Sequence, residues 1–210
     1  MAPETRTKGL ALAEGIILLA TAWSGIHPFD RLTWAMEVAP VVVSLPIVWF
    51  THRRYPLTTL VYGLLCVHAL LLLVGGAYTY AEVPLGFWLQ ETFALSRNPY
   101  DKIGHFAQGF VPALVAREVL IASGSARRGT LFAPIVLSIV LAISAAYELL
   151  EWAAAVILGE EAEAFLGTQG DPWDTQSDMA FALFGAVVAL AFLSRVHDRQ
   201  MAAHATWPAR

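Results

Sequence analysis

Long apolar stretches alternate with short polar segments along this chain, and they divide it into six candidate helices. An apolar window of about 17 to 25 residues matches the thickness of a bilayer when it folds as a helix. Six such windows are present, at residues 9–26, 33–50, 57–79, 101–122, 131–157 and 175–195. Because these windows leave no room for a separate soluble domain, the pattern predicts an all-α polytopic membrane protein with one integral-membrane domain, residues 1–210.

The segment between the third and fourth windows has a different pattern. Residues 84–96 are too few and too polar to cross a bilayer. Their apolar side chains share one helical face: Leu85, Trp88, Leu89 and Phe93. A short helix with one apolar face is typical of the membrane interface. We therefore expect six transmembrane helices in one bundle, with a short interfacial helix on the extracytoplasmic side.

The composition agrees with a location in the bilayer. Hydrophobic residues make up 57% of the chain and charged residues 14%, whereas a soluble domain carries roughly 25% charged residues. The lone cysteine, Cys66, cannot form a disulfide within the chain. No basic stretch with interleaved aromatic residues is present in the sequence, so the expected partner is the lipid bilayer and not a nucleic acid.

Basic residues are distributed unequally between the two sides of the predicted helices. Nine Lys and Arg residues fall in the segments on one side, three fall on the other side, and Arg117 lies within a window. Because cytoplasmic segments of membrane proteins are enriched in Lys and Arg, the side with nine, which carries both termini, is predicted to be cytoplasmic. Residues 80–100 and 159–173 are then extracytoplasmic.

The first window has an alternative interpretation as a cleaved signal peptide. Arg6 and Lys8 provide a basic start, and residues 20–22 resemble a small-residue cleavage site. Glu14 within the window favours a retained helix instead. Either outcome leaves the predicted orientation of the other five windows unchanged.

Three polar clusters stand at the ends of windows where a plain membrane span would be apolar. The residues concerned are Asp101, Lys102, His105 and Gln108 in the fourth window, Glu148 and Glu151 in the fifth, and Asp171, Asp174 and Asp178 at the sixth. The i, i+3 or i+4 spacings within them place side chains on one face of a helix. With the predicted orientation, the three clusters share one depth near the extracytoplasmic surface. We therefore expect one site, whose rim could include His27 and Glu37, although Asp171 and Asp174 could also cap the sixth helix.

The charge of these clusters indicates a bound cation or bound protons. Five carboxylates and Lys102 together leave four excess negative charges where water is scarce, and such a group must bind a cation, take up protons or open to water. Carboxylates with one imidazole suit zinc, manganese or iron, and carboxylates alone suit magnesium. The candidate metal ligands are His105, Glu148, Glu151, Asp174 and Asp178.

Three functions are compatible with such a site. A hydrolase or transferase acting on a lipid or lipid-linked substrate would use the catalytic candidates Asp101, Lys102, His105, Glu148 and Glu151. A carrier would use the carboxylates as a proton or cation relay, although polar residues are expected to be few in the cytoplasmic half. A structural or accessory protein would use the cluster only to hold three helices together. No hydrolase elbow, zinc-protease motif or phosphate loop is present in the sequence.

The three clusters also resemble a known family. The motifs that carry the resemblance are Asp-Lys-x-x-His-Phe at 101–106, Tyr-Glu-Leu-Leu-Glu-Trp at 147–152 and Gly-Asp-Pro-Trp-Asp-Thr-x-x-Asp at 170–178. They are similar to those of the uncharacterised bacterial inner-membrane family typified by YjdF. More distantly they resemble VanZ-like membrane proteins, which have Gln and Asn where Glu151 and Asp178 stand here. The closer resemblance implies a multi-pass protein of the bacterial inner (plasma) membrane, and it implies no particular activity, cofactor or substrate.

Overall fold

The chain folds into a bundle of helices, and the computed structural model describes residues 3–159 and 163–203 of it. The long helices are α1 (Pro3–Ser24), α2 (Arg31–Thr51), α3 (Thr59–Tyr78), α5 (Tyr100–Ala122), α6 (Phe132–Leu158) and α8 (Asp174–Ala202). The shorter elements are the 3-10 helix η1 (Tyr80–Glu82), α4 (Pro84–Thr92) and α7 (Glu163–Leu166). The described residues contain no strand, which confirms the predicted all-α class.

Each predicted window corresponds to one long helix, but α8 is longer than its window. It continues to Ala202, whereas the apolar pattern ends at residue 195. The segment predicted to form an interfacial helix contains α4, which covers Pro84–Thr92. Leu85 and Trp88 of this helix are both more than half exposed, so an apolar surface of α4 faces outward.

Four described helices are long and apolar enough to cross a membrane: α2, α3, α6 and α8. The predicted count of six spans is therefore not confirmed, because α1 and α5 do not reach the same standard. For α5, polar and charged residues along the helix, such as His105, Gln108 and Glu118, lower the mean hydropathy. Large apolar side chains are exposed on the outer surfaces of other helices, as expected for a surface that faces lipid. Phe50 of α2 and Ile157 of α6, for example, are about 80% exposed.

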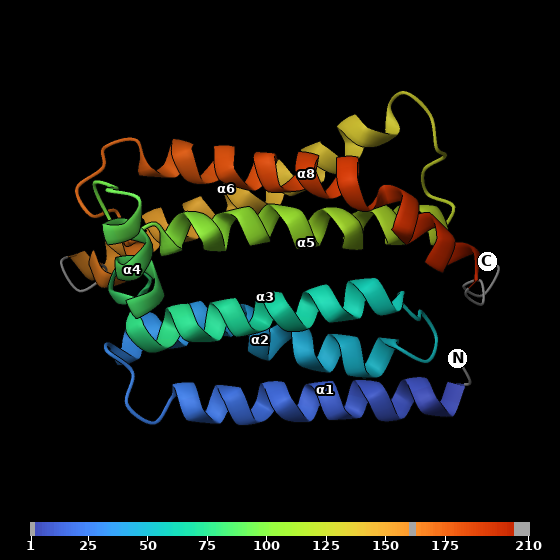
Figure 1. Cartoon of the computed structure of the whole chain (residues 1–210), viewed down its shortest axis with the longest axis horizontal. Coiled ribbons are helices and arrows are strands. Elements are labelled where there is room, and N and C mark those ends of the chain that lie inside the picture. Colours follow the sequence, from blue (N-terminus) through green and yellow to red (C-terminus); the bar gives the residue numbers. More distant parts are fainter. Residues whose placement is uncertain (1–2, 160–162, 204–210) are drawn as a thin grey trace.

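The long helices form two groups, as Figure 1 shows, with α1, α2 and α3 in one group and α5, α6 and α8 in the other. Contacts between α3 and α5 join the two groups. A main hydrophobic core lies around α5, where Val61, Leu114, Val136 and Ala186 from four different helices are completely buried. α1 begins at the end of the bundle where α8 ends (Figure 1).

The backbones of α5 and α8 pack unusually closely. A Cβ atom on Gly109 would lie 1.7 Å from the carbonyl oxygen of Ala182, and a Cβ atom on Gly185 would lie 2.1 Å from that of Phe106. No side chain fits at either glycine without moving the helices. Small residues commonly allow such close helix contacts in membranes. This contact sets the first turns of α8 beside the first turns of α5, where the predicted polar clusters begin.

Local signals fix several helix ends. The side chain of Asp30 accepts a hydrogen bond of 2.6 Å from the backbone N of Thr33 and caps α2. Thr58 caps α3 in the same way, by a hydrogen bond from the backbone N of Val61. Gly159 ends α6 with a φ of +61°, a left-handed conformation that glycine adopts without a steric cost.

Candidate functional site

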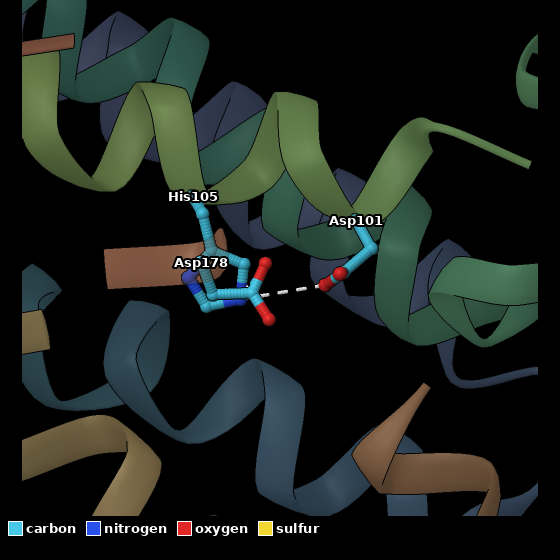
Figure 2. A group of neighbouring side chains, drawn as sticks. All are labelled: Asp101, His105 and Asp178. Atoms are coloured by element: carbon cyan, nitrogen blue, oxygen red, sulfur yellow. Dashed lines mark ion pairs between the residues drawn. The ribbon is translucent and has the colours of Figure 1, made fainter. Parts of the chain in front are cut away.

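The three predicted clusters meet at the end of the bundle where α5 and α8 begin. Figure 2 shows Asp101 and His105 of α5 near Asp178 of α8. The Nε2 atom of His105 lies 3.4 Å from Oδ1 of Asp101 and 3.8 Å from Oδ1 of Asp178. Its Nδ1 atom lies 3.9 Å from Oε1 of Glu148 on α6. All four residues are buried, so the fold gathers ionisable groups from three helices around one imidazole.

Two basic side chains compensate the aspartates. Nζ of Lys102 lies 2.7 Å from Oδ1 of Asp174, 2.5 Å from Oδ1 of Asp178 and 3.2 Å from Oδ2 of Asp101. Arg97, in the loop before α5, donates a hydrogen bond of 2.6 Å to Oδ1 of Asp174. Burial lowers the pKa of Arg97, but the hydrogen bond to Asp174 and the charge of that residue outweigh burial and hold the pKa above its ordinary value. Arg97 therefore stays charged within the cluster.

The negative charges of the two glutamates of α6 are less well compensated by basic side chains than those of the aspartates. Glu148 and Glu151 are both buried, and neither carboxylate oxygen of Glu148 has a hydrogen-bond partner among the described residues. Thr175 lies close to Glu148, but no hydrogen bond of normal geometry joins the two side chains. A buried carboxylate without partners destabilises a fold. Glu148 is thus the position in the cluster that most needs a ligand or a proton.

The side chains around His105 can be divided into two potential sets of metal ligands. In each set the potential ligand atoms lie within 4.8 Å of one another: Asp101, His105 and Asp178, and His105, Glu148 and Glu151. The Oε1 atom of Gln108 lies 3.1 Å from Nδ1 of His105. When Nδ1 donates to this oxygen, the Nε2 lone pair is directed at Asp101 and Asp178, as in many metal-bound histidines. Carboxylates with one imidazole fit a borderline or hard divalent cation.

Two of the predicted acidic residues have other contacts. Asp174, a candidate metal ligand, belongs to neither set and is held by Arg97 and Lys102. Oδ1 of Asp171 accepts a hydrogen bond of 2.9 Å from the backbone N of Trp173, as in the turns that precede helices. In this arrangement Asp174 compensates the two cations, and Asp171 shapes the entry into α8.

Glu37 extends the buried cluster, whereas His27 does not. The hydroxyl group of Tyr147 donates a hydrogen bond of 3.0 Å to Oε2 of Glu37, and Glu37 is only 4% exposed. The ring of Tyr147 also meets the ring of His105 edge to face, with centroids 6.4 Å apart. His27 is exposed. Of the two residues considered for the rim, α2 therefore contributes Glu37 through Tyr147.

Sequence reasoning missed Arg97 as part of the site and treated it only as a loop charge. Arg97 lies in the loop before α5, so no helical spacing in the sequence indicated that its Nη2 lies 3.8 Å from Oδ2 of Asp101. The loop is held by the next residue, Asn98, whose Nδ2 donates to the carbonyl oxygens of Ala81 and Val83. Asn98 also exchanges two hydrogen bonds with Gln169, at 3.0 and 2.9 Å. These bonds position the loops that precede α5 and α8.

A groove adjoins the cluster at Lys102. It has a volume of about 400 Å³, and its lining includes Arg97, Lys102, Ile103, Phe106 and Phe181. The lining combines two cations with an apolar wall from α5 and α8. Because Lys102 also contacts Asp174 and Asp178, a molecule in the groove would lie next to the buried carboxylates.

A second buried polar cluster lies at the opposite end of α5. Glu118 accepts hydrogen bonds from the backbone N and Oγ1 of Thr58, at 2.7 and 2.8 Å, and pairs with Nε2 of His197 at 2.8 Å. Arg117 bonds Nδ1 of His197 at 3.1 Å and Asp198 at 2.5 Å. Because arginine can only donate, Nδ1 of His197 accepts, and the proton of the ring lies on Nε2. The sequence-based expectation of few polar residues in the predicted cytoplasmic half is wrong, since the extended α8 supplies His197.

Helices of membrane-spanning length with exposed apolar surfaces, packed around buried ionisable groups, define a polytopic all-helical membrane protein. The chain belongs to the family described as "Predicted membrane protein (DUF2238)", which matches residues 10–199. It is 55% identical to inner membrane protein YjdF of Escherichia coli (strain K12) over 185 residues, which are 88% of each chain. No solved structure matches the chain. The predicted YjdF-type family is thus confirmed, and the distant likeness to VanZ-like proteins stays a prediction.

Proposed function

We propose that this chain is a multi-pass protein of the bacterial inner membrane that acts, with a divalent cation, on a lipid or lipid-linked substrate as a hydrolase or transferase. In the proposed topology six helices span the membrane, both termini are cytoplasmic, and the His105 cluster faces the extracytoplasmic side. The name of the Escherichia coli relative supports the inner membrane. Exposed arginines in the loops after α2 and α5, at the end opposite His105, support the orientation.

The observation that carries the cation proposal is the environment of Glu148. Its two buried oxygens have no hydrogen-bond partner among the described residues, and they lie in a ligand set with His105 and Glu151. A cation would satisfy those oxygens and offset the excess negative charge at once, whereas one proton satisfies only one oxygen. Zinc, manganese, iron and magnesium are the ions to consider, because the available donors are carboxylates and one imidazole.

The residues around the proposed cation have distinct roles. A bound divalent cation would polarise an oxygen of the substrate or lower the pKa of a water molecule. Asp101 would accept a proton from the attacking group, because His105 serves as a ligand of the cation, and Gln108 would orient the imidazole. Lys102 would exchange an aspartate partner for an anionic group of the substrate in the adjoining groove. Phe106 and Phe181 would contact the apolar part of a lipid substrate.

A proton or cation carrier is the second candidate, and the polar cluster around Glu118 favours it because carriers need polar groups at both ends. The connection between the clusters is poor, however. The buried residues of α5 between Gln108 and Arg117 are Gly109, Val111, Ala113 and Leu114. At 1.5 Å per residue this apolar stretch extends over about 13 Å, too far for direct proton transfer. The enzyme is therefore the better supported of the two.

Elemental analysis of the detergent-purified chain tests the cation proposal. We expect about one divalent ion per wild-type chain and almost none in the Glu148→Gln, Asp178→Asn double variant. Asp30→Asn is the matched control, since it removes an acid at the same end that caps a helix outside the cluster, and it should keep the metal. Wild-type protein that contains no divalent ion, and takes up none of the four ions offered, would contradict the proposal.

The proposed reaction has a separate test. Purified protein in lipid vesicles is incubated with a bacterial lipid extract, and release or transfer of headgroups is followed by mass spectrometry. Wild-type protein should change the extract, and Glu148→Gln should not. If the protein binds metal but the extract remains unchanged, the cation site stands and the lipid reaction is wrong.

A further inference from the structure

A larger cavity lies at the other end of the bundle, remote from His105. It has a volume of about 880 Å³ and is lined by the last turns of α2 and α5, the start of α3 and the loops that follow α2 and α5. Its deeper walls are apolar: Ile47, Val48, Leu65, Val115 and Val119. Val115 lies about 10 Å inside the end of α5, counted at 1.5 Å per residue. The cavity therefore reaches from the end of the bundle well into its apolar zone.

The part of the cavity at the end of the bundle is polar. Thr51 is the last residue of α2, and Arg54 and Tyr55 follow it. Ser123 and Ser125 follow the last turn of α5. The guanidinium group of Arg54 stacks on the ring of Tyr55, 5.5 Å from its centroid. The lining thus changes from hydroxyl and guanidinium groups outside to aliphatic side chains inside, as in a site for an amphipathic molecule.

The positive charge of the surface around the cavity favours an anionic ligand. Arg53, Arg54 and Arg127 are exposed in the two loops beside the cavity. The neighbouring carboxylates of Glu118 and Asp198 are already engaged, by Thr58 and His197 and by Arg117 and Arg128 respectively. A positive surface at one end of a membrane protein attracts anionic lipid headgroups.

We propose that this cavity binds an anionic phospholipid from the leaflet at the basic end. Arg54 and the hydroxyl groups of Thr51 and Ser125 would contact the phosphate, and one acyl chain would occupy the apolar part between α2 and α5. The bilayer is the source of apolar chains at this depth, and water would be poorly accommodated among Ile47, Val48 and Val119. This site is independent of the His105 cluster and of the reaction proposed there.

Native mass spectrometry of the full chain in detergent tests the site, with phosphatidylglycerol and phosphatidylcholine as probes. Phosphatidylglycerol should bind at lower concentration than phosphatidylcholine. Arg54→Gln should weaken phosphatidylglycerol binding about fivefold, the factor that about 1 kcal/mol per basic residue corresponds to. Arg53→Gln is the matched control in the same loop, outside the cavity lining, and should weaken phosphatidylglycerol binding less than Arg54→Gln does.

A second pair of variants separates occupancy of the cavity from diffuse charge. Val119→Trp fills the cavity and should reduce the bound lipid without changing any charge. Val187→Trp, an exposed apolar position on α8 outside the cavity lining, should bind lipid as the wild type does. Equal binding of the two lipids, equal effects of Arg53→Gln and Arg54→Gln, or unchanged binding by Val119→Trp would each overturn the proposal.

Discussion

The two buried polar clusters at opposite ends of α5 contain the same kinds of side chain and differ in how completely they are paired. Around Glu118, both carboxylate oxygens and both nitrogens of His197 have hydrogen-bond partners. Around His105, Glu148 has a hydrogen-bond partner at neither oxygen in the described part of the chain. Completely paired networks rigidify a fold, whereas an unsatisfied buried group in a native structure calls for a ligand or a functional explanation. The comparison therefore separates a structural cluster from a candidate site.

The largest expected effect comes from neutralising the carboxylate of the paired cluster. Glu118→Gln should lower the free energy of unfolding by about 3 kcal/mol, because the amide group faces donors from Thr58 and loses charge-assisted hydrogen bonds. Glu148→Gln, the isosteric change in the other cluster, should alter it by less than about 1 kcal/mol in metal-free protein, since it removes an unsatisfied buried charge. Denaturation of both variants in detergent gives the two values. Equal losses would mean that both clusters are structural.

An intermediate effect is expected at the contact that connects the two clusters. Gly109→Ala places a methyl group against the carbonyl of Ala182, and the helices must separate to accept it. We expect a loss of about 1 to 3 kcal/mol in stability, together with weaker metal binding, because α5 and α8 carry opposite sides of the His105 cluster. Gly63→Ala on α3 is the control, since nothing lies within 4 Å of the added atom. An unchanged melting temperature in Gly109→Ala would show that the close packing is unimportant.

The smallest effect concerns Asp30, an acid outside the cluster that provides a reference for a carboxylate at the His105 end. The hydrogen bond from the backbone N of Thr33 holds the pKa of Asp30 below its ordinary value. Its contribution to stability is therefore complete above the ordinary pKa of about 4 and is lost as the pH falls through the lower folded value. Asp30→Ala should cost about 1 kcal/mol at neutral pH and less in acid. A cost that does not shrink in acid would exclude this capping role.

The sequence predicted the helices and the meeting of three polar clusters, because apolar windows and helical spacing determine both. The cluster around Glu118 escaped prediction. His197 lies beyond the last apolar window, and only the observed length of α8 brings it back to α5. The role of Arg97 was also missed, since a loop residue carries no periodic signal. The close helix packing at Gly109 and Gly185 was not predicted either, because such a contact depends on which two helix faces meet.

The central claim is that the His105 cluster holds a divalent cation, and the melting temperature of metal-stripped protein tests it most directly. Zinc, manganese, iron and magnesium are added separately to wild type, His105→Ala and His197→Gln. At least one ion should raise the melting temperature of the wild type, since binding at 100 times the dissociation constant stabilises the folded state by about 2.7 kcal/mol. The increase should be absent in His105→Ala and retained in His197→Gln, whose starting temperature is lower. The account would be contradicted if none of the four ions changed the melting temperature of the wild type, or if the increase were also seen in His105→Ala.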